Sequence, residues 1–385
     1  MGYRIKELHI SGYKRLADVS VKTGGLNVLI GPNGCGKTSF LDVLELLSHS
    51  AGGRLKTLMD SGGFDSVLTR NDTTKGLCIA VNYREIDTER PPLNYELELV
   101  RLRDSYRISK EVLTQHFQNF EFPQQHLYRE GESLLYYSAT DKKKIPFEGP
   151  VERLETGLAQ VSGMYQQVSD FRKMMSECYY YRSSDLRTDI NSAIRIPDSM
   201  KQEELPKADG SGLASALYQM REEHEEAFDE VMNALQIVFP DLDKIALPTA
   251  GPGRLWLRWK DMHYKEGFYN YELSEGTLRF LLLATILCTP TLPPVLLFDE
   301  PEVNLHPQMM RVLVGLMRIA SARTQIFVAT HSEHFVRALK PEEVLAFSMD
   351  EGVTDIQNLD AEALKEWLTD YTLDQLWNMN IIGGR

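Results

Sequence analysis

The pattern of apolar and polar positions changes along the chain. Residues 1–30 alternate or form short apolar runs, which predicts strands, and the apolar spacing of "KTSFLDVLELLSH" predicts a helix. From Leu77 to about Phe147, strand-like segments broken by Pro, Gly and Asp clusters predict an antiparallel sheet. From Val151 to about Cys178 the pattern becomes helical, so helices are expected to follow the sheet.

The centre of the chain holds a polar segment, Arg182–Gly212, with few large apolar residues. It predicts a loop that is flexible near residues 183–212. The next segment, 213–239, has helical periodicity with a charged run in its middle, and it is predicted to be one helix. Strand-like pieces follow around "KIALP" and "RLWLRW".

About the last hundred residues alternate between helical and strand-like segments. The predicted segments are helix 277–288, strand 295–298, helix 308–319, strand 325–329, helix 333–339 and strand 344–347. Such alternation predicts parallel strands joined by helices.

Composition narrows the class of protein. The 385 residues are 43% hydrophobic, as in a globular protein, and the net charge of −13 argues against a generally basic nucleic-acid-binding surface. The four cysteines are far apart, which favours reduced thiols in a cytoplasmic protein over a disulfide framework or a zinc ribbon. No signal peptide or membrane-length apolar run is present, so a soluble protein without a membrane partner is expected.

The segment "GPNGCGKT", Gly31–Thr38, has the complete G-x-x-x-x-G-K-[ST] pattern between a predicted strand and a predicted helix. Glycines let backbone N–H groups approach phosphate oxygens, and the helix N-terminus adds partial positive charge. Lys37 is expected to reach the β- and γ-phosphates of ATP, and Thr38 to bind Mg²⁺. A chance glycine turn is the weaker alternative because the strand–loop–helix context also matches. The residues expected to bind the nucleotide here are Asn33, Gly34, Cys35, Gly36, Lys37, Thr38 and Ser39.

The segment "LLFDEPEVNLHP" places acids directly after a buried strand. Asp299 is predicted to bind Mg²⁺, and Glu300 to orient and deprotonate the water that attacks the γ-phosphorus. The alternative is that both acids cap a helix that begins near His306, since Pro301 and Pro307 mark a helix start.

These motifs resemble the ABC-type ATPase head of the SMC, RecF and OLD-like group, in its stand-alone form without a Toprim domain or coiled coil. Five elements occur in the family's order: Gly31–Thr38, "LSEGTLR" (273–279), "LLFDEPE" (296–302), "NLHP" (304–307) and "VATHS" (328–332). The resemblance implies an α/β P-loop NTPase with a mixed central sheet, an antiparallel β-subdomain and an inserted helical lobe. The expected parts are residues 1–150, the lobe 151–272, and residues 273–385, which carry the signature loop, Walker B, D-loop and switch histidine.

The resemblance also implies roles for individual residues. Ser274 and Gly276 match the signature loop, which binds the γ-phosphate held by the other subunit, although Glu275 replaces the usual first glycine. His331 matches the switch histidine, so the implied catalytic residues are Lys37, Glu300 and His331. A helix N-cap remains an alternative for Ser274, and a capping or core histidine for His331.

Other features stay open. The Q-loop glutamine is not identified among four candidates: Gln160, Gln166, Gln167 and Gln202. The basic pair Lys14-Arg15 lies in the first hairpin, where the family often brings a basic residue near the nucleotide, but a solvated charge is an equal alternative. His306, His331 and Asp299 suggest a metal site only weakly, because no i,i+4 histidine pair is present.

The spacing separates the family's branches. The 260 residues between Thr38 and Asp299 lack the heptad pattern of a coiled coil. The 54 residues after His331 are too few for a Toprim domain. One chain supplies one Walker A loop and one signature loop, so the resemblance implies a head-to-tail homodimer with two ATP molecules.

The leading hypothesis is an ATPase whose dimer opens and closes to act on DNA or an associated nuclease or effector, in DNA repair or anti-phage defence. The alternative is an ATP-gated regulator that holds a toxin or other protein without touching nucleic acid; a small-molecule kinase is a third hypothesis. A basic groove is conceivable from Arg153, Arg172, Lys173, Arg182 and Arg187.

Overall fold

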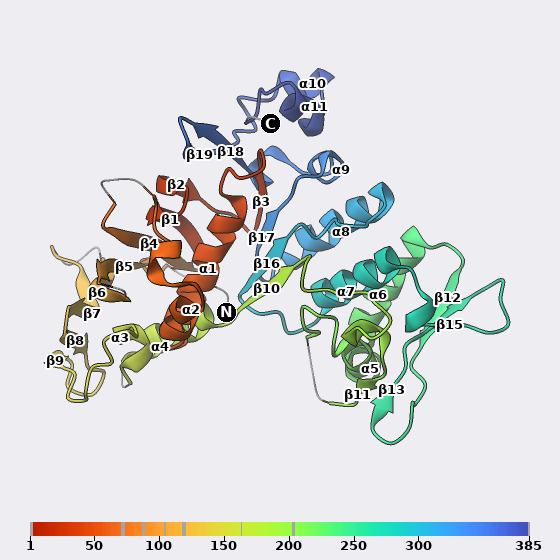
Figure 1. The fold of residues 1–385 in the computed structure, drawn as a ribbon, viewed down its shortest axis with the longest axis horizontal. Coiled ribbons are helices and arrows are strands. Elements are labelled where there is room, and N and C mark those ends of the chain that lie inside the picture. The colour runs from red at the N-terminus through yellow and green to blue at the C-terminus, as the bar shows by residue number, and fades with distance from the viewer. Residues whose placement is uncertain are drawn as a thin grey trace. The chain divides into compact units, whose positions relative to one another are not determined.

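The computed structural model of the chain describes residues 3–70, 74–86, 89–103, 105–117, 121–162, 164–201 and 205–383 (Figure 1). The chain forms two compact units. The first comprises Met1–Tyr179, Pro293–Leu297 and Lys340–Arg385, and the second comprises Tyr180–Leu292 and Phe298–Leu339.

An eight-stranded sheet dominates the first unit, with the strand order β2-β1-β4-β5-β6-β7-β8-β9. All of its neighbouring strands pair antiparallel, which confirms the predicted sheet and adds β7, whose polar sequence "QQHLYRE" was not expected to form a strand. The strands are β1 (Tyr3–Tyr13), β2 (Leu16–Lys22), β4 (Gly76–Glu85), β5 (Leu93–Leu102), β6 (Ser105–Gln115), β7 (Gln124–Glu130), β8 (Ser133–Tyr137) and β9 (Lys144–Pro146).

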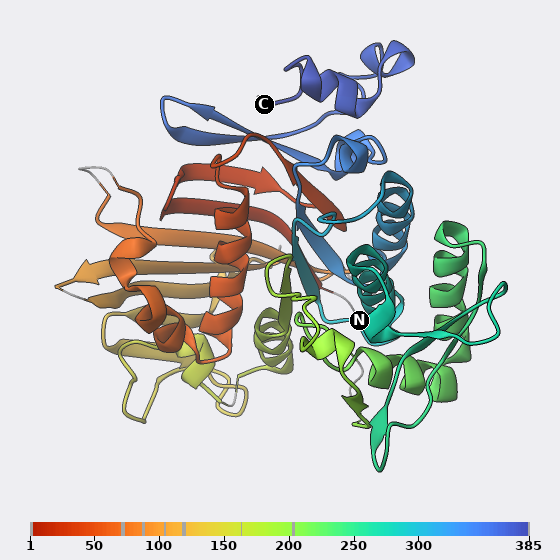
Figure 2. The same cartoon turned by 45° about the vertical axis from the view of Figure 1, so that its right-hand side comes forward.

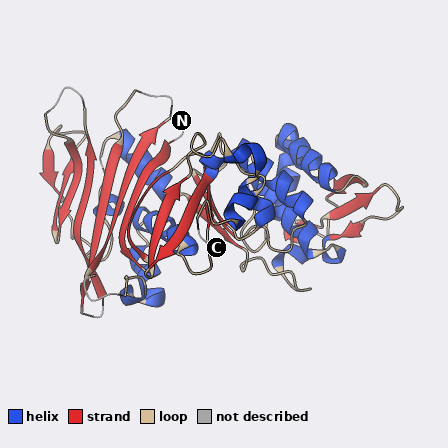
Figure 3. Cartoon of the chain, turned by 90° about the horizontal axis from the view of Figure 1, so that it is seen from above, coloured by secondary structure: helices blue, strands red, loops and turns tan. Residues whose placement is uncertain are grey.

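Helices cover one face of this sheet (Figures 2 and 3). They are α1 (Lys37–Ala51), α2 (Leu55–Gly62), α3 (Gly157–Gln160) and α4 (Gln166–Ser176). Residues along β4 and β5 alternate between buried and partly exposed, as expected for a sheet with one covered face. On the buried face, the rings of Tyr83 and Tyr95 pack against Phe171 of α4 with centroids 5.0 and 5.9 Å away.

A second group of strands in the first unit is mixed. The fully buried strand β3 (Leu26–Ile30) runs parallel to β18 (Val344–Asp350), and β18 pairs antiparallel with β19 (Val353–Asn358). The parallel pairing confirms the prediction from the βα alternation and brings the C-terminal part of the chain beside the strand that leads into "GPNGCGKT". The unit ends in α10 (Trp367–Asp370) and α11 (Leu373–Asn378).

The second unit is mainly helical, and its longer helices surround the apolar α7, of which twelve residues are buried. The helices are α5 (Leu213–Glu223), α6 (Glu225–Val238), α7 (Glu275–Cys288), α8 (Pro307–Ala320) and α9 (Glu333–Val336). The unit also contains β17 (Gln325–Ala329) and the ends of β10 (Cys178–Arg182) and β16 (Val295–Asp299). Two small antiparallel sheets complete it: β11 (Asp198–Ser199) with β13 (Arg254–Leu255), and β12 (Leu242–Ala246) with β14 (Arg258–Asp261) and β15 (Phe268–Tyr269).

Two predicted elements differ from the structure. The single helix predicted for 213–239 is wrong: the chain breaks at His224, whose φ and ψ of −142° and 60° end α5 and begin α6. Periodicity misses the break because no Gly or Pro marks it, while Glu225 and Glu226 suit the positive end of a new helix. The helix predicted for 333–339 ends at Val336.

The segment predicted as a loop near 183–212 has little regular structure, with one short 3₁₀ helix at Ala193–Arg195 and the two-residue strand β11. Residues 202–204 lie outside the described residues, and the flexibility of the segment stays a prediction. In the described part of the chain, none of the helices is both long and apolar enough to span a membrane.

Candidate nucleotide-binding site

The Walker A residues form a loop between β3 and α1 in the first unit. Pro32, Asn33 and Gly34 form the outer part of the loop, and Asn33, Gly34 and Thr38 are exposed. Helix α1 begins after Gly36, which adopts φ 104° and has no side chain with which to cap the first-turn N–H groups. A helix start of this kind is suited to binding an anion such as phosphate.

The Lys37 side chain lies inside this loop and is only 4% exposed. Its ammonium donates hydrogen bonds to the carbonyl oxygens of Gly31 and Pro32 at 2.8 and 2.9 Å. Burial raises the pKa of the neighbouring Cys35 thiol, although the positive charge of Lys37 opposes this shift. The loop therefore holds a buried cation and a neutral thiol, which is a suitable charge arrangement for binding a polyanion.

Two glycines explain why the loop has its shape. A Cβ at Gly31, whose φ is 146°, would lie 2.4 Å from the carbonyl oxygen of Phe347 in β18. At Gly36, a Cβ would lie 3.1 Å from Thr354 Oγ1 in β19, whose hydroxyl donates a 2.7 Å hydrogen bond to the Cys35 carbonyl. The C-terminal strands thus fix the loop, and only glycine fits at Gly31.

A pocket of about 500 Å³ also lies within the first unit. It is lined by the pair Lys14-Arg15, by part of the 66–70 segment and by the β18–β19 turn. Lys14 forms an ion pair with Asp42 of α1 at 2.7 Å, and Arg15 donates a hydrogen bond to Met349 Sδ. The backbone of Thr354 connects this pocket to the loop, since its N–H donates to the Arg15 carbonyl.

The acids of "LLFDEPE" lie in the second unit at the end of β16. The Asp299 carbonyl accepts a hydrogen bond from the Ser183 N–H, and the Glu300 N–H donates to the Ala329 carbonyl at the end of β17. Glu300 has a φ of 52°, an unusual value for a residue with a side chain. Neither acid caps the next helix, because α8 begins at Pro307 and His306 accepts the capping hydrogen bond from Gln308.

Glu300 and His331 lie together at the ends of these two strands. His331 Nε2 is 3.6 Å from Glu300 Oε1, and both side chains are partly exposed at 35% and 43%. The residue that caps α9 is Ser332, so His331 is neither a helix cap nor a core histidine. A carboxylate beside an imidazole at a solvent-accessible strand end can accept or relay a proton.

A third acid, Glu302, supports this pair. It is 8% exposed, and its Oε1 accepts hydrogen bonds from Thr330 Oγ1 at 2.5 Å and from the His331 N–H at 3.1 Å. Burial raises the pKa of Glu302 above its usual value, although these hydrogen bonds oppose the shift. Glu302 therefore fixes the backbone that carries His331, a role that the sequence motif did not reveal.

The signature loop also lies in the second unit. Ser274 caps α7 by accepting a hydrogen bond from the Thr277 N–H, so within a single chain Ser274 is a helix N-cap. A Cβ at Gly276 would lie 2.4 Å from the Asn304 carbonyl, which shows that the signature and D-loop backbones touch at this glycine. Burial works to raise the pKa of Glu275, but hydrogen bonds from Asn304, Thr188 and Arg279 outweigh it and lower the pKa, so the charge at this position is compensated.

The Q-loop candidates have local roles or lie outside the described residues. Gln160 Nε2 donates to the Glu152, Glu155 and Thr156 carbonyls, and Gln166 donates to Asp170. Gln167 is half-buried, and Gln202 lies outside the described residues. None of these contacts identifies a Q-loop.

The cations proposed for a basic groove mostly contact the protein itself. Arg153, Lys173 and Arg187 pair with Glu132, Glu177 and Asp189. Arg172 donates to two carbonyl groups, and Arg182 lies over the Tyr180 ring with its Cζ 3.7 Å from the ring centroid.

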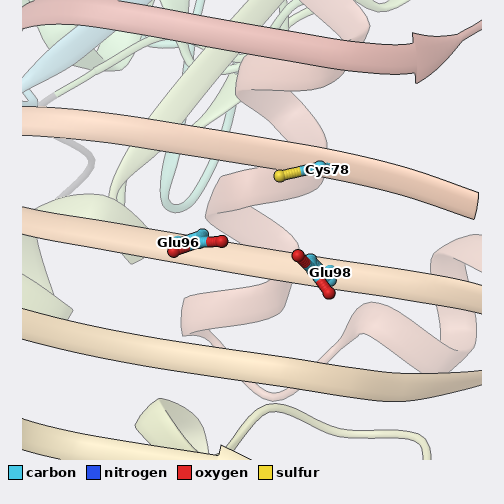
Figure 4. A group of neighbouring side chains, drawn as sticks. All are labelled: Cys78, Glu96 and Glu98. Carbon is cyan, nitrogen blue, oxygen red and sulfur yellow. The ribbon is translucent and has the colours of Figure 1, made fainter.

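A possible metal-binding cluster occurs elsewhere, on the outer face of the eight-stranded sheet (Figure 4). Among the described residues, only Cys78, Glu96 and Glu98 bring three potential ligand atoms within 4.8 Å of one another. Burial, followed by the two carboxylates, raises the pKa of Cys78 to about 11. Since Glu96 pairs with Lys110 and Glu98 accepts from Ser109, the cluster is explained by cross-strand contacts.

Comparison with known proteins places the chain in a family. The sequence profile of the family described as "AAA domain, putative AbiEii toxin, Type IV TA system" matches residues 26–337. Septu protein PtuA of Bacillus thuringiensis is 22% identical over 355 residues, covering 90% of this chain and 76% of that protein. The L-cystine import ATP-binding protein TcyN of Bacillus subtilis (strain 168) is 32% identical over 117 residues, covering 30% and 43%.

The fold also matches a solved structure. The SmcHead bound to the C-winged helix domain of ScpA superposes with a TM-score of 0.58 at 14% identity, covering 94% of this chain and 99% of that one. This likeness confirms the predicted α/β fold of ABC ATPase-head type.

Proposed function

The chain belongs to the family described as "AAA domain, putative AbiEii toxin, Type IV TA system" and has the fold of an SMC head, and we propose that it hydrolyses ATP with Mg²⁺. The observation that carries this proposal is the Walker A loop. Its buried Lys37, its close-fitting glycines and its open helix start together make a cradle for phosphate groups.

We propose roles for the remaining residues on chemical grounds. Thr38 and Asp299 have the hard oxygen ligands that suit Mg²⁺, which supplies charge neutralisation on the phosphate oxygens when bound. Glu300 orients and deprotonates the attacking water, and His331 beside it stabilises the charge that develops. The pocket lined by Lys14 and Arg15 takes the nucleoside part of ATP.

The active species in this proposal is a pair of chains arranged head to tail. Each chain supplies one Walker A loop and one signature loop with Ser274 and Gly276. ATP closes the pair because its γ-phosphate binds the partner's signature loop, and ADP lacks that group. Opening and closing then act on DNA or on a nuclease or effector protein, in DNA repair or anti-phage defence.

Loss of nucleotide binding tests the proposal most directly. Lys37→Ala should abolish binding of a fluorescent ATP analogue, because it removes the buried positive charge of the Walker A loop. Lys56→Ala, which removes an exposed lysine of α2, is the control and should bind as the wild type does. Unchanged affinity in Lys37→Ala would contradict the assignment of the loop.

A second candidate function is an ATP-gated regulator that holds a protein and does not touch nucleic acid. Two observations favour it: the description of the family names a toxin–antitoxin system, and the net charge of −13 does not suit binding to nucleic acid. Purification from native cells with and without ATP separates the two candidates, since this one requires a protein that co-purifies in only one nucleotide state.

A further inference from the structure

The second unit contains the small sheet β12–β14–β15 (Figure 1, teal). One face of this sheet carries aromatic and basic side chains. On β14, Trp259 points to the core and packs against Phe239, so Arg258 and Lys260 lie on the opposite face. The cross-strand partners Lys244 and Tyr269 share that face, because residues directly opposite each other project to the same side.

The aromatic rings at this face form one group. The rings of Tyr269 and Tyr271 stack with centroids 5.6 Å apart and planes 7° from parallel, and Trp256 contacts both edge-on at 5.6 and 5.5 Å. Tyr271 is 45% exposed, and Arg258 Cζ lies 5.9 Å from the Tyr269 ring centroid. The group therefore presents the Tyr271 ring to solvent, with the half-buried Trp256, Arg258 and Tyr269 beside it.

The positive charges beside the rings repel one another. Lys244 and Lys260 are directly opposite each other in the antiparallel pair, where like charges are destabilising. Among the described residues, no carboxylate pairs with Lys244, Arg258 or Lys260, and the nearby Glu272 accepts the Tyr269 N–H. In a chain of net charge −13, this concentration of cations fits an anionic partner.

The backbone that carries the rings is held in place. Arg195 Nη1 donates to the carbonyls of Asn270 and Tyr271 at 3.2 and 2.9 Å, and the buried Asn270 donates to the Ile194 carbonyl at 2.8 Å. A face whose shape is fixed before binding loses less entropy on binding a ligand.

We propose that this face binds single-stranded nucleic acid. Bases stack on Tyr271 and Trp256, and phosphates bind Lys244, Arg258 and Lys260. This inference rests on the proposed function in which the ATPase acts on DNA, and it names the surface that would bind the DNA. Tyr271 lies three residues before Ser274, so occupancy of the face is placed to influence the signature loop.

Fluorescence anisotropy of labelled (dT)₂₀ with the full chain tests this surface. Trp256→Leu/Tyr271→Leu should weaken binding by about tenfold or more, since each stacked base contributes substantially. The control is Trp367→Leu/Tyr371→Leu, an exposed Trp–Tyr pair of the first unit whose rings also contact each other, which should bind as the wild type does. Thermal melts by circular dichroism check that each variant is folded.

A salt titration tests the charges separately. Lys244→Gln/Lys260→Gln should reduce the slope of log Kd against log salt by about 1.4, whereas Lys56→Gln/Lys143→Gln should leave it unchanged. The proposal is overturned by absence of (dT)₂₀ binding at low salt, which would leave the face to a protein partner, or by equal losses in the control pairs. Lys37→Ala should lose ATP hydrolysis and keep (dT)₂₀ binding, so failure of this inference is distinguishable from failure of the ATPase proposal.

Discussion

At the scale of single residues, the buried Glu302 makes stability depend on pH. Its folded-state pKa is raised above the unfolded value, mainly by burial, so its contribution is fully present below about pH 4 and is lost as pH rises through the raised pKa. Glu302→Gln keeps an oxygen for Thr330 and the His331 N–H but cannot ionise. We expect its thermal midpoint to exceed that of the wild type by more at pH 8 than at pH 5.

Glu302→Ala is the companion variant. It leaves the Thr330 hydroxyl and the His331 N–H without this acceptor, which should cost about 1–3 kcal/mol at pH 5, less at pH 8, and displace His331. An equal pH profile for the glutamine variant and the wild type would show that Glu302 does not titrate in the folded chain.

Gly276 is a residue whose identity follows from one contact. A methyl group at this position would lie 2.4 Å from the Asn304 carbonyl, so Gly276→Ala must displace either the signature loop or the D-loop. We expect ATP hydrolysis to fall by at least about tenfold, as is common when a site is displaced by 1 Å, while nucleotide binding at the Walker A loop persists.

The control for this prediction is Gly315→Ala in the same unit. Gly315 is inside α8 and a Cβ there meets nothing within 4 Å, so alanine should raise stability by about 0.5–1 kcal/mol. Full activity in Gly276→Ala would mean that the backbone contact has no part in hydrolysis.

At the scale of elements, the sequence predicted what local rules decide. The strand–loop–helix at Gly31–Thr38 and the parallel β3–β18 pair follow from apolar runs, glycines and βα alternation. The helix break at His224 and the polar strand β7 were missed because neighbouring elements, rather than local composition, determine them.

Contacts between distant segments explain the missed parts of the site. Thr354 bonds to the Walker A loop from β19, and Glu302 accepts a hydrogen bond from Thr330, which follows β17. The aromatic face also requires the pairing of three short strands, since Trp256 and Tyr271 are not neighbours in the sequence. A single sequence gives residue types and spacing but not which distant segments meet.

A buried carboxylate connects two elements of the first unit. Glu111 of β6 is fully buried and accepts hydrogen bonds from the N–H groups of Gly157 and Leu158 at 2.6 and 3.0 Å and from the Tyr95 hydroxyl at 3.0 Å. Glu111→Ala should destabilise the unit by about 3 kcal/mol, because three buried donors lose their acceptor. Tyr95→Phe, which removes only one of these bonds, should cost about 1 kcal/mol in urea unfolding.

At the scale of the whole molecule, the proposed ATPase needs two copies of the chain. A single chain offers one Walker A loop and one signature loop, and in the proposed arrangement these meet from different subunits. In this proposal hydrolysis reopens the pair, so a variant that binds ATP without cleaving it should accumulate in the closed state.

Glu300→Gln is that variant, because glutamine retains the shape of the side chain but cannot accept the proton of water. In size-exclusion chromatography with light scattering, it should be monomeric without nucleotide and have twice that mass with ATP and Mg²⁺. Adding Ser274→Arg, which obstructs the signature loop, should restore the monomer while ATP still binds. If Glu300→Gln stays monomeric with saturating ATP, the shared-site arrangement is wrong, although Lys37 and its loop could still bind nucleotide within one chain.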